Sequence, residues 1–242
     1  ESYVAAAQQV EQEFGLATLE FDPRAIEKLE SFPAIEKALL RYAENRLLED
    51  ADGEILTLAE SRKAGFWCGV KPWLQARWAL VASAAEVMLE ADRVEQALKK
   101  APDSFAGMIK EYAESTEPWC LLDTRHRHME SCWYNYEADG EDHDNTEKLV
   151  IKARQRYAKV GSEMAQRFLA QLQKSAPDKG VLCQREVFEK HVKASLGREK
   201  IAYVWVDALR FEMGRELARL LKEDFDVNLY VALAAVPTIT EI

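Results

Sequence analysis

The sequence predicts a mainly α-helical protein that continues into the first βαβ unit of a truncated α/β domain. Three observations support this fold class. Apolar residues recur at helical spacing up to about residue 197, two short apolar runs follow after Gly197, and one amphipathic helix separates those runs. We therefore expect two domains, a helical region over residues 1–197 and the start of an α/β domain over residues 198–242.

The first helices of the helical region are expected between residues 24 and 98. Residues 24–49 have a helical pattern that Pro33 divides in two, since proline lacks an amide hydrogen and clashes with the preceding turn. A long helix is expected to begin near Pro72, because apolar residues follow it at spacings of four and three. The residues on this face are Leu74, Trp78, Val81, Ala85 and Met88.

Two more helices are expected on either side of the acidic stretch EADGEDHDN. The first covers about residues 119–137, and its apolar face carries Leu122, His126, Met129, Trp133 and Tyr136. The second begins at a capping-box pattern of Asp144 and Glu147 and ends at SAPDKG. Its apolar face carries Val150, Ala153, Tyr157, Val160, Met164 and Phe168.

Composition limits the class of protein. A chain of 242 residues that is 48% hydrophobic can bury a sizeable core, and it contains neither an apolar run of membrane-spanning length nor a signal peptide. Its first residue is Glu1 rather than Met and its last lies in an expected loop, so we expect a piece of a longer cytoplasmic protein. The four cysteines lack metal or redox spacing and are interpreted as buried thiols.

Two charged segments have alternative interpretations. The net charge of −10 argues against a general nucleic-acid binder, yet residues 147–174 carry seven basic and two acidic residues. That segment is interpreted as a solvated helix face, with a phosphate-backbone contact as the alternative. The stretch DTRHRHMES brings Asp123, His126 and His128 together, but histidines two apart on a helix point to different sides. We interpret His126 as a core histidine, with a metal site, or an anion contact through Arg125 and Arg127, as alternatives.

The change of pattern after Gly197 predicts the βαβ unit. The run KIAYVWVD, apolar from Ile201 to Val206, suits a strand that is covered on both faces of a parallel sheet. ALRFEMGRELARLLKE then predicts a helix, and VNLYVALAAV predicts a second strand. The apolar face of this helix carries Leu209, Met213, Leu217 and Leu220. A crossover of this kind sets the two strands parallel.

Asp207 ends the first expected strand, and Thr238 and Thr240 follow the second in a Pro-Thr-Ile-Thr turn. Ligands bind at the carboxyl edge of such sheets, so the carboxylate and a hydroxyl are expected to face one another there. The structural alternative is that Asp207 caps a helix beginning at Ala208 and that Thr240 caps a later helix. Dinucleotide binding is disfavoured because the turn VDALRF lacks glycines.

Two stretches of the C-terminal part carry a resemblance to a known family. They read VWVDALRFEMGRELARLL and AAVPTITEI. Together they resemble the start of the PglZ phosphatase domain of bacterial BREX phage-defence systems, a branch of the alkaline phosphatase superfamily. The resemblance covers residues 200–242, while LDTRHRHMESCWYNYE and KLVIKARQRYAKVGSEMAQRFL are similar to the segment that precedes this domain in long PglZ proteins.

The resemblance implies roles for particular residues. Asp207 resembles the first metal-binding aspartate, and Thr240 resembles the hydroxyl nucleophile that also binds metal, with Thr238 as the runner-up. Family members use two metal ions, commonly zinc, to activate the threonine, which forms a covalent phospho-threonine. The other ligands lie downstream of the nucleophile in the superfamily. We therefore expect this piece alone to be inactive and to bind no metal tightly.

The function expected from the resemblance is that of a metal-dependent phosphatase or phosphodiesterase. Its substrate is expected to be a phosphoester, and nucleotides and nucleic acids are among the possible substrates. The alternative is a non-catalytic scaffold whose helical region binds other BREX subunits, such as a DNA methyltransferase or a small accessory protein. No contact with a membrane is expected.

Overall fold

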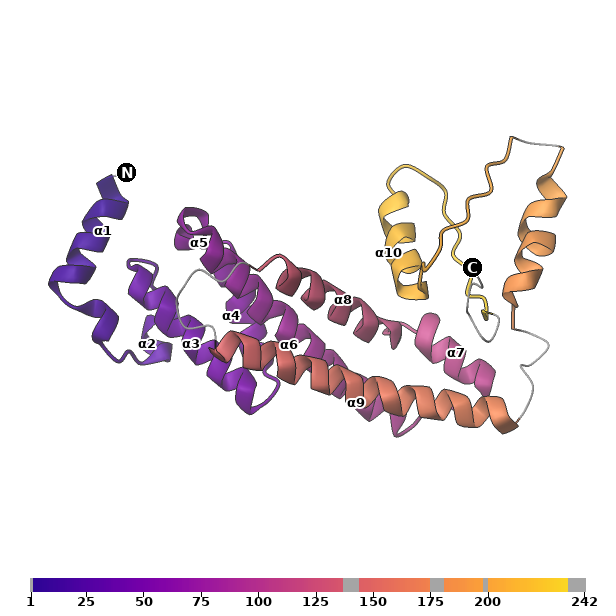
Figure 1. Ribbon diagram of the computed structural model, residues 1–242, viewed down its shortest axis with the longest axis horizontal. Helices are drawn as coiled ribbons and strands as arrows, with labels where there is room; N and C mark the ends of the chain where they lie inside the picture. The colour runs from indigo at the N-terminus through magenta and orange to yellow at the C-terminus, as the bar shows by residue number, and fades with distance from the viewer. Residues whose placement is uncertain (1, 137–143, 175–180, 198–199, 235–242) are drawn as a thin grey trace. The chain divides into compact units, whose positions relative to one another are not determined.

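The computed structural model describes residues 2–136, 144–174, 181–197 and 200–234 (Figure 1). The chain forms two compact units. The first consists of Glu1–Ala97 with Arg125–Ser162, and the second of Leu98–Thr124 with Glu163–Ile242. The expected boundary at residue 198 falls inside the second unit and stays a prediction.

The first unit is built from helices, as the sequence predicts. Pro23 and Pro33 each occupy the first turn of a helix, and Pro72 begins the longest helix of this unit, since proline fits where the amide hydrogen has no intrahelical partner. The elements up to this point are α1 (Ser2–Glu13), η1 (Leu16–Thr18), α2 (Pro23–Ile26), α3 (Pro33–Glu49), α4 (Gly53–Lys63), α5 (Phe66–Val70) and α6 (Pro72–Leu98). The expected division of residues 24–49 at Pro33 is confirmed.

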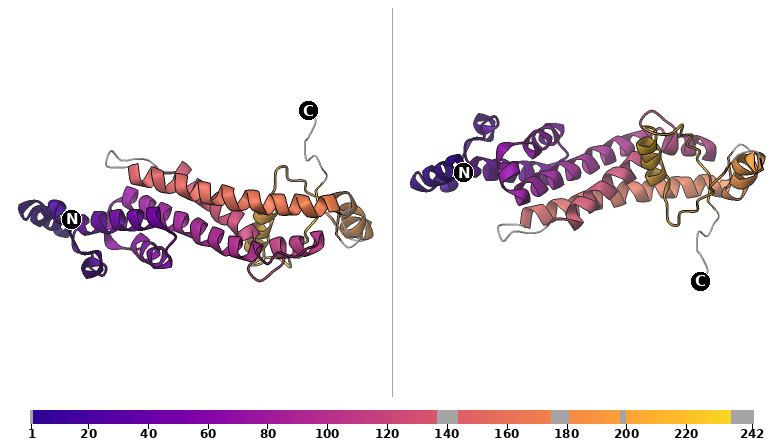
Figure 2. Two further views of the ribbon diagram at one scale, coloured as in Figure 1. Left: turned by 90° about the horizontal axis from the view of Figure 1, so that it is seen from below. Right: turned by 90° about the horizontal axis from the view of Figure 1, so that it is seen from above.

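The core of the first unit lies between α3, α6, α8 (Cys120–Tyr134) and α9 (Asp144–Lys174), and Figure 2 shows α6 and α9 running alongside each other. The predicted apolar face of α6 is buried along its whole length, from Leu74 to Met88. Met129 of α8 and Val150 and Ala153 of α9 join it. Spacings of three and four therefore predicted correctly which side of each helix turns inward.

Two buried ion pairs lie inside this core, and the sequence pattern did not predict them. Arg62 of α4 donates to Glu36 of α3 at 2.7 Å, and Trp78 donates to the other oxygen of Glu36 at 3.2 Å. Burial raises the pKa of Glu36, while the charge of Arg62 opposes this shift. Arg77 of α6 donates two hydrogen bonds of 2.8 Å to the carboxylate of Glu44 in α3.

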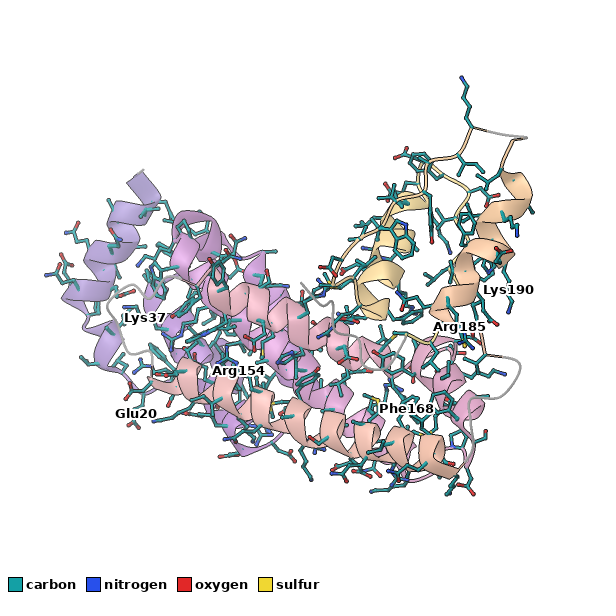
Figure 3. All side chains as sticks on the ribbon, turned by 45° about the vertical axis from the view of Figure 1, so that its right-hand side comes forward. Glu20, Lys37, Arg154, Phe168, Arg185 and Lys190 are labelled. Carbon is teal, nitrogen blue, oxygen red and sulfur yellow. The ribbon has the colours of Figure 1, made fainter. Side chains whose placement is uncertain are left out.

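The basic face of α9 is largely neutralised by carboxylates of the same unit. Arg154, labelled in Figure 3, pairs with Glu130 at 2.7 Å, and Arg156 bonds to both Asp92 and Glu95 of α6. Lys159 also pairs with Glu95, at 2.9 Å. Guanidinium groups held in this way are less available to a phosphate backbone, which supports the interpretation as a structural helix face.

Replacing Glu95 with Gln is expected to alter the acid stability of the protein. Hydrogen bonds from Arg156 and Lys159 lower the pKa of Glu95 from 4.5 to about 2. A carboxyl with a depressed folded-state pKa adds stability above its unfolded pKa and loses it as the pH falls through the folded value. Urea unfolding should therefore give a lower free energy of unfolding for Glu95→Gln than for wild type above about pH 5. The two free energies should converge towards about pH 2. A difference that stays constant over this window would contradict the prediction.

The second unit contains α7 (Phe105–Ala113), the first turn of α8, the C-terminal part of α9 and α10 (Phe211–Leu221). Between α9 and α10 the described residues form short turns of helix, namely η2 (Gln184–Glu186), η3 (Phe188–Val192) and η4 (Lys193–Ser195). Phe168 of α9, labelled in Figure 3, packs edge-on against Phe105 and Tyr112 of α7. The expectation of a nearly continuous helical pattern up to residue 197 therefore holds less well after Lys174.

The expected βαβ unit is not confirmed. Its helix is present as α10, but residues 200–206 and 227–234 form no strand within the described ranges. Leu233 instead makes an isolated parallel bridge with Cys183, in which its amide donates to the Leu182 carbonyl at 2.8 Å. A strand needs a partner along its length, and here the only pairing of this segment in the described residues is with a segment that was not predicted to be extended.

Among the described residues, no helix combines the length and the hydropathy that a membrane span requires.

Candidate functional site around Asp207

The apolar run before Asp207 lies on the surface of the second unit. Val204 is 74% exposed and Trp205 is 70% exposed, although the sequence pattern predicts a strand buried on both faces. The Tyr203 ring touches Trp205 and Phe188, with ring centroids 5.0 Å and 5.9 Å away. Consecutive large apolar side chains are seldom left exposed on a protein surface. This segment is therefore a surface against which another part of a protein could pack.

Asp207 itself lies on a tight turn and is exposed. One carboxylate oxygen accepts a hydrogen bond from the Ala208 amide at 2.9 Å. Ala208 has a φ of 55°, a left-handed conformation that costs energy for a residue with a Cβ atom. Strain of this kind persists where flanking structure holds the chain.

The structural alternative for Asp207 is wrong. The helix after it begins at Phe211 rather than at Ala208, and Arg210 is its N-cap residue, without a side-chain cap. Asp207 is therefore too far upstream to accept from the first free amides of α10. Its side chain therefore does not cap α10 and instead accepts from the neighbouring Ala208 amide.

Helix α10 leaves part of its predicted apolar face exposed. Its buried residues are Glu212 and Ala218, whereas Leu217 and Leu220 of the apolar face are exposed. On the apolar face that the sequence identified, Met213 is half-buried and Leu209 is exposed as well. The Phe211 ring of α10 lies 6.2 Å from the Tyr112 ring of α7, and Arg215 approaches the Cys120 sulfur of α8 at 3.9 Å.

A polar cluster lies beneath α10. The Tyr112 hydroxyl donates to Asp123 at 2.8 Å, and Arg210 bonds to Glu212 and approaches Asp123 at 3.9 Å. Burial, together with the charge of Asp123, raises the pKa of Tyr112. Burial also raises the pKa of the Cys120 thiol to about 11, although the nearby Arg215 opposes this shift. These groups are therefore a neutral phenol, a neutral thiol and paired charges near neutral pH.

The second half of the predicted site lies outside the described residues. Thr238 and Thr240 fall in the range 235–242, so their expected approach to Asp207 stays a prediction. The described segment before them ends at Ala234, one residue after the bridge between Leu233 and Cys183.

The other candidate residues have structural partners. His126 is stacked on Tyr157 with ring centroids 3.8 Å apart and lies 3.3 Å from Glu130, as expected of a satisfied histidine at the edge of the core. Arg125 pairs with Glu86 at 2.8 Å. All four cysteines are free thiols, and Cys68 and Cys120 are buried.

In the described part of the chain, no group of three or more His, Cys, Asp or Glu side chains is arranged to hold a metal ion. Asp207 is an exposed carboxylate, a type of side chain that zinc accepts, and the described residues place no further ligands around it. The expectation that this piece binds no metal tightly stays a prediction. No protein-family model, no curated protein and no solved structure is similar enough to this chain to count as a match.

Proposed function

We propose that this chain is part of a metal-dependent phosphatase or phosphodiesterase of the PglZ kind, from a BREX-type antiviral defence system in the cytoplasm. In this proposal Asp207 is one metal ligand and Thr240 is the nucleophile, with Thr238 as the runner-up. Two zinc ions would be held by the complete enzyme, and the substrate is a phosphoester. The proposal rests on the resemblance of the motifs around Asp207 and Pro-Thr-Ile-Thr.

The observation that most supports the proposal is the position of Asp207. Its carboxylate is exposed on a strained turn, between an apolar run and an amphipathic helix, and it does not cap that helix. A side chain with this freedom is what a ligand site needs. A structural aspartate would instead be expected to bond to the helix N-terminus.

The uncovered apolar surface supports an α/β layer in the complete domain. Val204, Trp205 and Leu220 are all more than half exposed. Burying one such side chain contributes about 1.5–3 kcal/mol, so a sheet that covered residues 201–206 and the apolar face of α10 would gain substantial stability. Such a sheet would place Asp207 at the end of a strand, as the proposed function requires.

The test is phosphodiester hydrolysis by the complete protein. With added zinc, wild type should hydrolyse bis(p-nitrophenyl) phosphate, and Asp207→Asn should lose at least about a hundredfold in rate, since even outer-shell groups of metal sites contribute 10–100-fold. Asp226→Asn is the matched control, because Asp226 is an exposed aspartate of the same segment. If Asp207→Asn is as active as this control, Asp207 is not a metal ligand of the site.

The second candidate function is a scaffold that binds a DNA methyltransferase or a small accessory protein of the same system. Exposed aromatic residues of the first unit favour it: Tyr3 and Phe14 of the N-terminal segment and Phe66 of α5 are each more than a third exposed. Wild-type protein that captures such a subunit but hydrolyses no phosphodiester with any added divalent metal would favour the scaffold over the enzyme.

A further inference from the structure

Arg210 connects the Asp207 turn to the body of the second unit. It lies three positions after Asp207 and immediately before α10. Its Nε donates to Glu212 Oε1 at 2.6 Å, and Nη2 lies 2.5 Å from the same oxygen. Glu212 is only 1% exposed, so this guanidinium neutralises a carboxylate that is almost entirely removed from water.

The same guanidinium faces a second carboxylate on a different helix. Nη2 of Arg210 is 3.9 Å from Oδ1 of Asp123 in α8, and the other oxygen of Asp123 accepts from the Tyr112 hydroxyl of α7 at 2.8 Å. The Phe211 ring lies 6.2 Å from the Tyr112 ring. The N-terminus of α10 is thereby attached to both α7 and α8.

The far side of α10 has no comparable attachment in the described part of the chain, since Leu217 and Leu220 are exposed there. Arg215 adds a contact on the polar face, with Nη1 3.9 Å from the Cys120 sulfur. The position of α10, and of the strained turn before it, therefore depends on this polar face. Ala208, with its left-handed φ of 55°, lies two positions before Arg210, so the strained turn is directly continuous with this attached segment.

We infer that Arg210 is a positioning residue: it holds the start of α10 against α8 through Asp123, neutralises the buried Glu212 of α10 itself, and so fixes the turn that carries Asp207. The role in catalysis rests on the proposed function, whereas the anchoring does not. Without Arg210, Glu212 would be a buried carboxylate without its cation, and relief comes most easily when the start of α10 moves away from α7 and α8.

Thiol labelling tests the anchoring on the 242-residue chain, because Cys120 lies beneath α10 and is fully buried. In Arg210→Ala, maleimide labelling of Cys120 followed by mass spectrometry should accelerate at least about tenfold, the factor that corresponds to about 1.4 kcal/mol of easier opening. Cys68 is the internal control, since it is buried in the first unit. Its labelling rate should change less than about twofold, an amount below that energy scale.

Two further variants complete the labelling test. Arg219→Ala is the matched control, because Arg219 is an exposed arginine of the same helix, and its Cys120 should label as in wild type. The double variant Arg210→Ala with Glu212→Gln should restore much of the protection, since it removes the buried charge along with its partner. An unchanged Cys120 rate in Arg210→Ala, or equal acceleration of Cys120 and Cys68, would overturn the anchoring.

Hydrolysis by the complete protein tests the consequence for Asp207. Arg210→Ala should raise the zinc concentration that gives half-maximal activity, at least about tenfold by analogy with outer-shell residues of metal sites, and Arg219→Ala should not. An unchanged zinc requirement would overturn the positioning role even where labelling confirms the anchor. Wild type without any hydrolytic activity would instead refute the proposed function, and the labelling result would still decide whether Arg210 anchors the helix.

Discussion

Thr240→Ala is expected to abolish phosphoester hydrolysis by the complete protein while the fold and partner binding persist. The reason is its place in VPTITEI, after the second apolar run and opposite Asp207 in the proposed site. Losing the hydroxyl removes the covalent step altogether, and deleting a nucleophile costs several orders of magnitude in rate. The measurement is a phosphodiesterase assay with added metal, with circular dichroism and partner capture as checks on the fold.

Thr238→Ala is the matched control for this variant, because it removes the same group two positions upstream in the same turn. It should reduce the rate much less. If Thr240→Ala keeps more than about a tenth of the wild-type activity, a loss of only about 1.4 kcal/mol of barrier, Thr240 is not the nucleophile. If Thr238→Ala is the inactive variant, the role belongs to Thr238.

Arg77→Met is expected to lower the free energy of unfolding by about 3–5 kcal/mol, the usual cost of leaving a buried charge without its partner. Arg77 makes two hydrogen bonds of 2.8 Å to Glu44, which is 0% exposed and also accepts from Thr146 at 2.6 Å. After the substitution, Thr146 alone cannot compensate for the charge. Urea unfolding monitored by circular dichroism measures the loss.

The control for Arg77→Met is Arg41→Met, since Arg41 is an exposed arginine on α3 and such surface changes stay within about 0.5 kcal/mol. The double variant Arg77→Met with Glu44→Leu should recover most of the stability, because apolar side chains often replace a buried ion pair without loss. A loss below about 1 kcal/mol in Arg77→Met would show that water reaches Glu44 in solution.

Much of the helical fold could be predicted because the spacing of apolar residues along a short stretch of sequence indicates a helix. The burial of Leu74, Trp78 and Val81 followed from their spacing of three and four residues. Pro33 and Pro72 indicated helix starts because proline lacks the amide hydrogen that a position inside a helix would need. These signals need no knowledge of the neighbouring helix. The apolar stripe of α6 is covered in this way, whichever helix supplies the cover.

The polar contacts could not be predicted in the same way. Glu36 and Glu44 lie on the core side of α3, where a charged residue indicates a buried ion pair. The sequence near them does not indicate that Arg62 and Arg77 are the partners. The same holds for the segment around Leu233, which pairs with Cys183 rather than with the run before Asp207. Contacts between residues far apart in sequence depend on how whole helices are arranged.

The sequence by itself determined that α10 is an amphipathic helix and that an aspartate precedes it closely, whereas the left-handed turn at Ala208 came from the structure. Only the tertiary structure decided which face of that helix is used. Glu212 is buried beside the exposed Arg210, which also approaches Asp123 of α8, the carboxylate that accepts from Tyr112 of α7. The leucine face remains exposed because apolar burial needs an apolar surface opposite, which the described residues do not provide at that position.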